Sequence, residues 1–200
     1  MEDIKEVKIR TEEWANPTPA GLVALAVACF GFFGFLNGHV DPATAMPLLG
    51  CWLIGGFVIQ VIVGILDLKE GNRTGGNTFL FFSAFFMLSA GLLMFVKYST
   101  GIADPKLDGF AWSALTLVMF LWLPAFFRPF GILSLVVVAV TAALPFLALV
   151  DLGILSSGWA HISGYSLLIA AVLAIYLSAA IVVNNAYGRE VYPLLRLKKK

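Results

Sequence analysis

The amino-acid sequence predicts an all-α integral membrane protein folded as a bundle of six transmembrane helices. Two observations carry this prediction. The chain is 60% hydrophobic and only 12% charged, with a mean hydropathy of +0.92, whereas an ordinary soluble domain is about 25% charged. Six long apolar runs also follow one another along the chain. The composition therefore excludes a water-soluble globular enzyme, and it excludes an intrinsically disordered chain as well.

Each of the six runs is free of Asp, Glu, Lys and Arg. The expected spans are 19–37, 46–66, 77–96, 109–127, 129–150 and 162–184. A helix needs about 20 apolar residues to cross the hydrocarbon core, and backbone groups in lipid must be satisfied within a helix or a closed barrel. Barrel strands would be about 10 residues long and would alternate polar with apolar side chains. The continuous runs therefore favour helices.

Three of the expected spans begin with residues that are typical of helix starts. Asn16 and Pro17 precede the first span, Asn77-Thr78 opens the third, and the run 129–131 opens the fifth. Asn is a good N-cap, and Pro is tolerated in a first helical turn. If these helix amino termini converge, their free N–H groups would attract an anion. Plain helix capping explains the same residues.

The basic residues predict the orientation of the chain, because Lys and Arg accumulate on the cytoplasmic side. Those on the side of the two termini are Lys5, Lys8, Arg10, Lys69, Arg73, Arg128, Arg189, Arg196, Lys198, Lys199 and Lys200. The other side has Lys97 and Lys106. Both termini are therefore expected in the cytoplasm of a multi-pass plasma-membrane protein. We expect a cytoplasmic segment at 1–15, a pore domain at 16–187 and a basic cytoplasmic tail at 188–200.

The spans lack the groups that most chemistry requires. Asp41, Asp67 and Asp151 fall at span ends, and His39 and His161 fall in outer loops. No metal-ligand spacing and no catalytic set is visible, so we expect no enzyme activity, no metal and no cofactor. The net charge of +1 gives no case for a nucleic-acid partner. Ion-coupled pumps usually bury an ionisable residue near mid-membrane, so its absence favours a conduit or carrier for something small.

Two polar residues inside the spans stand out as candidates for lining a solute pathway. Gln60 lies about two thirds along the second span, and Tyr176 is the tyrosine nearest the middle of any span. A buried phenol needs a hydrogen-bond partner or a polar lumen. A helix–helix hydrogen bond is the alternative interpretation for both side chains.

Several stretches resemble motifs of the acetate uptake transporters, also called the succinate–acetate permease family. The run Asn16-Pro17-Thr18-Pro19-Ala20-Gly21-Leu22 is similar to that family's Asn-Pro-Ala-Pro-Leu-Gly-Leu motif. Further matches follow in order along nearly the whole chain. They are Gln60, Gly64, Asp67 and Gly71-Asn72; Phe79 and 82–86; His161 and Gly164; and Ala174-Ile175-Tyr176-Leu177, Asn184, Gly188-Arg189 and Pro193. The first and last of these motifs are specific.

The resemblance implies a homohexamer with a pore through each six-helix subunit, for acetate and related short monocarboxylates or for succinate. Members are described as proton-coupled symporters or as anion channels. The family's pore has a narrow hydrophobic constriction, which by position falls on Leu25, Phe82 and Leu144. The family often has Phe in place of Leu25, Tyr in place of Phe82 and a carboxylate in place of Ile181, so a drier constriction is expected in this chain.

Two routes for a carboxylate stay open, because no Lys or Arg in the spans offsets the cost of burying its charge. The ion would cross partly hydrated, with hydrogen bonds from Gln60, Tyr176, Asn184 and backbone N–H groups. Alternatively the substrate would cross as the neutral acid. A carboxylic acid with a pKa of about 4–5 is mostly ionised at neutral pH, so the second route predicts uptake that rises as external pH falls.

The sequence therefore predicts transport of acetate and similar small carboxylates, with protons, the lipid bilayer and further copies of the chain as partners. The residues expected in the pathway are Leu25, Phe82, Leu144, Gln60, Tyr176 and Asn184. Those expected at the cytoplasmic mouth are Asn16, Pro17, Pro19, Gly21, Leu22, Asn77 and Thr78. Two alternatives remain: a channel for another small solute such as formate, and a structural subunit of a membrane complex.

Overall fold

The computed structural model describes residues 15–101, 103–128 and 131–195. Its helices are α1 (Thr18–Leu36), α2 (Pro42–Lys69), α3 (Arg73–Phe81), the π-helix η1 (Phe82–Ser89), α4 (Ala90–Thr100), α5 (Pro105–Phe127), α6 (Ile132–Asp151), the 3₁₀ helix η2 (Ser157–Trp159) and α7 (Ala160–Tyr187). α3, η1 and α4 follow one another without a break and form a single rod, the third span. Among the described residues, six helices are long and apolar enough to cross a membrane, which confirms the predicted fold class.

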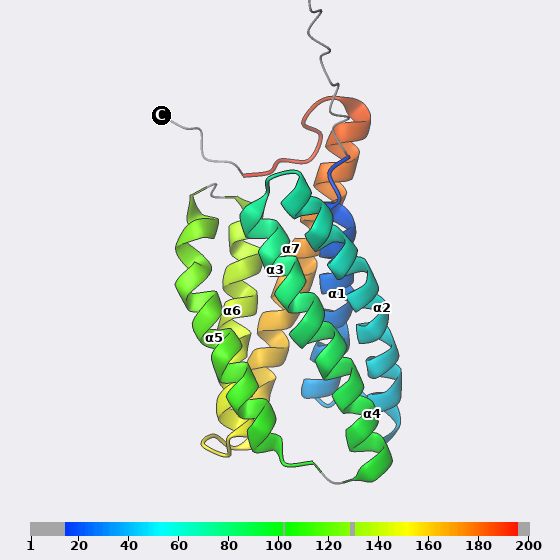
Figure 1. The fold of residues 1–200 in the computed structure, drawn as a ribbon, viewed down its shortest axis with the longest axis vertical. Helices are drawn as coiled ribbons and strands as arrows, with labels where there is room; N and C mark the ends of the chain where they lie inside the picture. Colours follow the sequence, from blue (N-terminus) through cyan, green and yellow to red (C-terminus); the bar gives the residue numbers. More distant parts are fainter. Residues whose placement is uncertain (1–14, 102, 129–130, 196–200) are drawn as a thin grey trace, which may run out of the picture.

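The rods run roughly side by side, and both described chain ends lie at one end of the bundle (Figure 1). We call this the terminal end; it also carries the α2–α3 and α5–α6 connections. The α1–α2, α4–α5 and α6–α7 connections lie at the opposite end. Residues 1–14 of the predicted cytoplasmic segment and residues 196–200 of the basic tail fall outside the described residues.

The helices pack side by side in an arc that runs from α5 through α6, α7, α1 and α2 to the third span. Glycines allow the second and third spans to approach closely. A Cβ on Gly50 would lie 2.9 Å from the carbonyl oxygen of Gly91, and one on Gly64 would lie 3.0 Å from that of Gly76. Because lipid provides no hydrophobic drive between helices, close backbone packing of this kind holds spans together.

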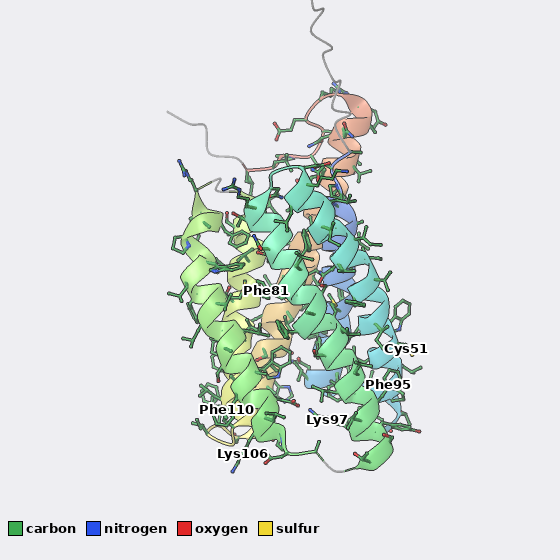
Figure 2. The ribbon with its side chains drawn as sticks, in the orientation of Figure 1. Cys51, Phe81, Phe95, Lys97, Lys106 and Phe110 are labelled. Carbon is green, nitrogen blue, oxygen red and sulfur yellow. The ribbon has the colours of Figure 1, made fainter. Side chains whose placement is uncertain are left out.

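Side chains close the arc between the third span and α5. Phe81 stacks edge-on against Trp122, with ring centroids 5.4 Å apart, and Phe86 lies in the same way against Trp112 at 6.2 Å. Near the opposite end, the Lys97 ammonium lies 2.6 Å from the Asp108 carboxylate; Figure 2 shows Phe81 and Lys97 at these two levels. The space inside the bundle is therefore bounded on this side by side chains.

The predicted start of the third span is wrong by one turn. α3 begins at Arg73, because the Asn72 side chain caps it by accepting a hydrogen bond from the Gly75 N–H at 3.1 Å. Gly75 and Gly76, which precede the expected start, both lie inside the helix. Gly76 is needed there for close packing, since a Cβ would lie 2.8 Å from the backbone nitrogen of Leu68.

Candidate solute cavity

A cavity of about 180 Å³ lies in the half of the bundle nearer the terminal end. Five of the six spans contribute side chains to its wall, and most of these lie three, four or seven residues from another on the same helix, as one helix face requires. The wall residues are Thr18, Leu22 and Leu25 on α1; Gln60 and Asp67 on α2; Thr74, Gly75, Thr78, Phe79 and Phe82 on the third span; Met119, Ala125 and Phe126 on α5; and Leu133, Val136, Val137 and Val140 on α6. Asn72 adds a polar side chain from the α2–α3 connection.

The deep end of the cavity is apolar. Leu25 and Phe82 are only 8% and 6% exposed and lie among its wall residues. Beyond them toward the opposite end, Phe86 lies 5.4 Å from Phe82 and 5.1 Å from Phe32 between ring centroids. The cavity therefore ends against a cluster of aromatic rings.

Leu144, the third residue expected at the constriction, is buried on α6. It follows the wall residue Val140 by four residues, so it continues the same helix face one turn deeper. It does not itself line the cavity. The structure thus places Leu25 and Phe82 together at the wall, with Leu144 beyond them.

Gln60 is fully buried and lines the cavity. Its amide nitrogen donates a hydrogen bond to the carbonyl oxygen of Gly21 at 3.3 Å. Its side-chain oxygen has no hydrogen-bond partner among the described residues. An unpaired buried acceptor is costly, which makes this oxygen a candidate contact for a solute.

Asp67 is the functional candidate that sequence reasoning undervalued. The sequence placed it at a span end, but its side chain is only 1% exposed and lines the cavity. Asn72 Nδ2 donates a hydrogen bond to it at 2.9 Å, and Thr18 Oγ1 donates another at 3.4 Å. The spacing of Asp67 and Asn72 around a short turn was the signal in the sequence, since their side chains meet across that turn.

The residues of the first motif divide between capping, packing and the cavity wall. Asn16 accepts a hydrogen bond from the Thr18 N–H at 3.0 Å, and Pro17 is the residue before the helix. The Pro19 carbonyl accepts one from Ser178 on α7 at 3.0 Å. A Cβ on Gly21 would lie 2.6 Å from the Phe79 ring, so glycine lets that wall residue approach α1. Leu22 lines the cavity.

Asn77 and Thr78 lie in the second turn of α3 rather than at its start. Thr78 lines the cavity while its hydroxyl donates to the Thr74 carbonyl at 2.8 Å. Asn77 is exposed, and its side chain donates to the Arg73 carbonyl at 2.8 Å. Neither residue caps the helix as expected. At the fifth span, residues 129 and 130 lie outside the described part, and α6 begins at Ile132 after Gly131.

Tyr176 and Asn184 lie apart from Gln60 and do not line this cavity. The Tyr176 side chain is partly exposed, and its hydroxyl donates to the Pro193 carbonyl at 3.0 Å. Asn184 accepts from the Val191 and Tyr192 N–H groups and donates to the Tyr192 carbonyl. Both side chains hold the carboxyl-terminal segment.

The reason lies in the packing of α7. Its buried face consists of small and aliphatic residues such as Ala170, Ala174 and Ser178. Tyr176 is two residues away from the last two of these, so it points to a different side of the helix.

The opposite end carries a second polar cluster that the sequence did not predict. Lys97 pairs with Asp108 across the α4–α5 seam, and the Asp151 carboxylate at the end of α6 lies within electrostatic range of both. None of these residues lines the cavity. The described residues contain no group of three or more His, Cys, Asp or Glu side chains that would hold a metal ion.

The six long apolar helices and the cavity between them are those of a multi-pass membrane protein. The chain belongs to the GPR1/FUN34/yaaH family, whose profile matches residues 4–197. It is 27% identical over 188 residues to the "succinate-acetate/proton symporter SatP" of Escherichia coli strain K12, covering 90% of this chain and 95% of that protein.

Two further comparisons agree. An uncharacterized protein of Methanothermobacter thermautotrophicus is 25% identical over 195 residues, covering 92% of both chains. The fold matches that of a solved structure described as the bacterial acetate channel SatP, with a TM-score of 0.80, 23% identity, and coverage of 90% of this chain and 99% of that chain. This last match shows that the six-helix fold is shared.

Proposed function

We propose that the protein transports acetate and related short-chain carboxylates across the membrane, with succinate as a further candidate substrate. The observation that carries the proposal is the cavity walled by Leu25 and Phe82 in a chain of this family. Its volume is about 180 Å³, below the roughly 300–1,000 Å³ of sites for drug-sized ligands. The name of the Escherichia coli relative supports the carboxylate substrate.

In this proposal Leu25, Phe82 and Leu144 form the hydrophobic constriction, and Gln60 and Asp67 supply the polar contacts on the terminal side of it. The solute enters or leaves at the terminal end past Thr18, Asn72 and Thr78. Both termini lie in the cytoplasm of a plasma-membrane protein, because the basic residues are concentrated on their side. Residues 16–187 form the pore domain.

We also propose that the chain assembles as a homohexamer. A Cβ on Gly34 or Gly55 would meet no other atom within 4 Å, so these glycines leave room for another helix. An apolar hollow on the outer face of α1, α2 and α7 includes Val27, Phe30 and Trp52. Small residues on a membrane-facing helix typically mark contacts between spans. Mass measurement of the protein in detergent tests the number of subunits.

Radiolabelled acetate uptake into proteoliposomes tests the function, with formate and succinate as competitors and protein-free liposomes to measure passive entry of acetic acid. We expect uptake above the passive rate and competition by succinate. A formate channel would show formate flux with little acetate flux. A structural subunit would leave uptake at the passive rate, which would refute the proposal.

A further inference from the structure

The cavity is poor in groups that stabilise an anion. Among the described residues that line it there is no Lys, Arg or His, and its single ionisable side chain is Asp67. The Gln60 side-chain oxygen, fully buried, has no donor. An anion requires hydrogen-bond donors or positive charge, whereas these two side chains present acceptors.

Most of the side chains that could donate a hydrogen bond in the cavity already donate one to the protein. Asn72 and Thr18 donate to the two oxygens of Asp67, and the Thr78 hydroxyl donates to the carbonyl of Thr74. Gly75 allows this arrangement, because a Cβ there would lie 2.7 Å from an Asp67 oxygen and would also strike the Asn72 amide. The site is therefore built around the Asp67 carboxylate.

A second carboxylate that enters this space meets Asp67 as a like charge. Two carboxyl groups in one site avoid the repulsion by sharing a proton, since the O–H of one then donates a short, charge-assisted hydrogen bond to the other. Gln60 lies seven residues before Asp67 on α2, about 10 Å deeper along the helix. Its unpaired oxygen accepts the same kind of O–H donor.

We propose that Asp67 binds the substrate through one shared proton, so that the substrate moves past Asp67 toward Gln60 as the carboxylic acid. The proposal rests on the transport function proposed above. The proton comes from the aqueous phase and joins the substrate carboxylate to the Asp67 carboxylate. When the substrate moves on, the proton stays bound to the substrate oxygen, and the Asp67 carboxylate is again ionised.

The other charges near Asp67 lie at the surface. They are Lys69 and Glu70 on α2 and Arg73 on α3, all exposed; Glu70 acts on Asp67 electrostatically. α1, the third helix that contributes to the site, carries no charged residue. Exposed charges are strongly screened by salt. Asp67 is therefore the group whose protonation directly changes the charge inside the cavity.

Acetate affinity of the purified protein, measured by calorimetry with sodium acetate between pH 6 and 8.5, tests the proposal. Acetate itself is almost fully ionised over this range, since its pKa is about 4–5. We expect the affinity of the unaltered protein to fall by up to about tenfold per pH unit, because one proton is taken up on binding. Asp67→Asn donates an amide N–H to the anion, so its affinity is expected to change by less than about twofold over the range.

Two further variants serve as controls. Asp67→Glu keeps a carboxyl group and is expected to keep the pH dependence. Asp41→Asn removes a negative charge at the opposite end of α2, where Asn keeps the N-cap, and is expected to behave as the unaltered protein. If the pH dependence of Asp67→Asn equals that of the unaltered protein, the substrate carries its proton without Asp67 and the proposal is wrong. An unaltered protein whose affinity does not vary with pH also refutes it.

A failure of the proposed function looks different, because the unaltered protein would then neither bind acetate nor move it at any pH, and both proposals would fall. If Asp67→Asn does not fold, Thr18→Val provides the decisive measurement. It removes one donor from the ionised Asp67, so the pH at which affinity starts to fall is expected to rise. An unchanged pH profile in Thr18→Val overturns the proposal.

Discussion

The two ends of the bundle close the central space by different means. Toward the terminal end there is an open cavity, bounded by apolar side chains and by one buried carboxylate. At the opposite end the helices are joined by an ion pair between Lys97 and Asp108, at the far side of the aromatic rings. The comparison indicates that the ion pair stabilises the contact between α4 and α5. The cavity at the other end is instead defined by its volume, its apolar wall and a few buried hydrogen-bonding groups.

The largest effect is expected from breaking the ion pair at the opposite end. Lys97→Met leaves Asp108 without its partner and Asp151 without a nearby positive charge. Because both carboxylates are partly buried, we expect the free energy of unfolding to fall by about 3 kcal/mol. Thermal unfolding in detergent measures the loss. The double variant Lys97→Met, Asp108→Leu is expected to recover most of it, and no recovery would mean that the pair does not account for the effect.

A smaller effect is expected where α2 meets α3 at the terminal end. Gly76→Ala places a methyl group 2.8 Å from the Gly64 carbonyl, so the helices must separate and stability is expected to fall by about 1–3 kcal/mol. Gly158→Ala is the control, because the nearest atom to its Cβ is the Ser156 Oγ at 4.0 Å. Equal unfolding temperatures for the two variants would contradict this account of the packing.

Widening the deep end of the cavity is expected to change transport. Phe82→Ala removes a buried ring from the wall, and we expect the uptake of a longer carboxylate such as butyrate to rise about tenfold, equivalent to about 1.4 kcal/mol of barrier. Phe85→Ala is the control, since that ring is 54% exposed on the outer surface of the same helix. Unchanged uptake and selectivity in Phe82→Ala would remove Phe82 from the constriction.

The smallest effect is expected at Tyr176. Tyr176→Phe loses the hydrogen bond to Pro193, so hydrogen exchange in residues 190–195 is expected to accelerate by the equivalent of about 1 kcal/mol. Acetate uptake is expected to stay unchanged, because this side chain does not line the cavity. A marked loss of uptake would contradict this prediction and would indicate that Tyr176 contributes to the transport pathway.

The sequence predicts those features of the structure that follow from the membrane environment alone. Continuous apolar runs define helices in lipid, so the six spans are visible without coordinates. The start of the third span was missed because Asn77-Thr78 resembled a helix start. The helix begins at Arg73, and Gly76 within it is required by the close approach of α2. The fit of a helix to its neighbour is not encoded in its own composition.

The site was predictable to the extent that it follows helix faces. Leu25, Phe82 and Gln60 line the cavity. Tyr176 does not, because depth along a span does not determine the direction in which a side chain points. The burial of Asp67 depends on Thr18 and Asn72 folding over it, and such contacts between separate helices become visible only in three dimensions.

The π-helical stretch Phe82–Ser89 gives the third span one residue more than a regular helix of the same length would hold. Ser89 donates its hydroxyl to the carbonyl of Ala84, five residues back, within this widened turn. The widened turn changes the rotation of α4 relative to α3, while both halves of the rod stay packed against α2. A homologue with a regular third helix would align to this chain with a single-residue gap between positions 82 and 89.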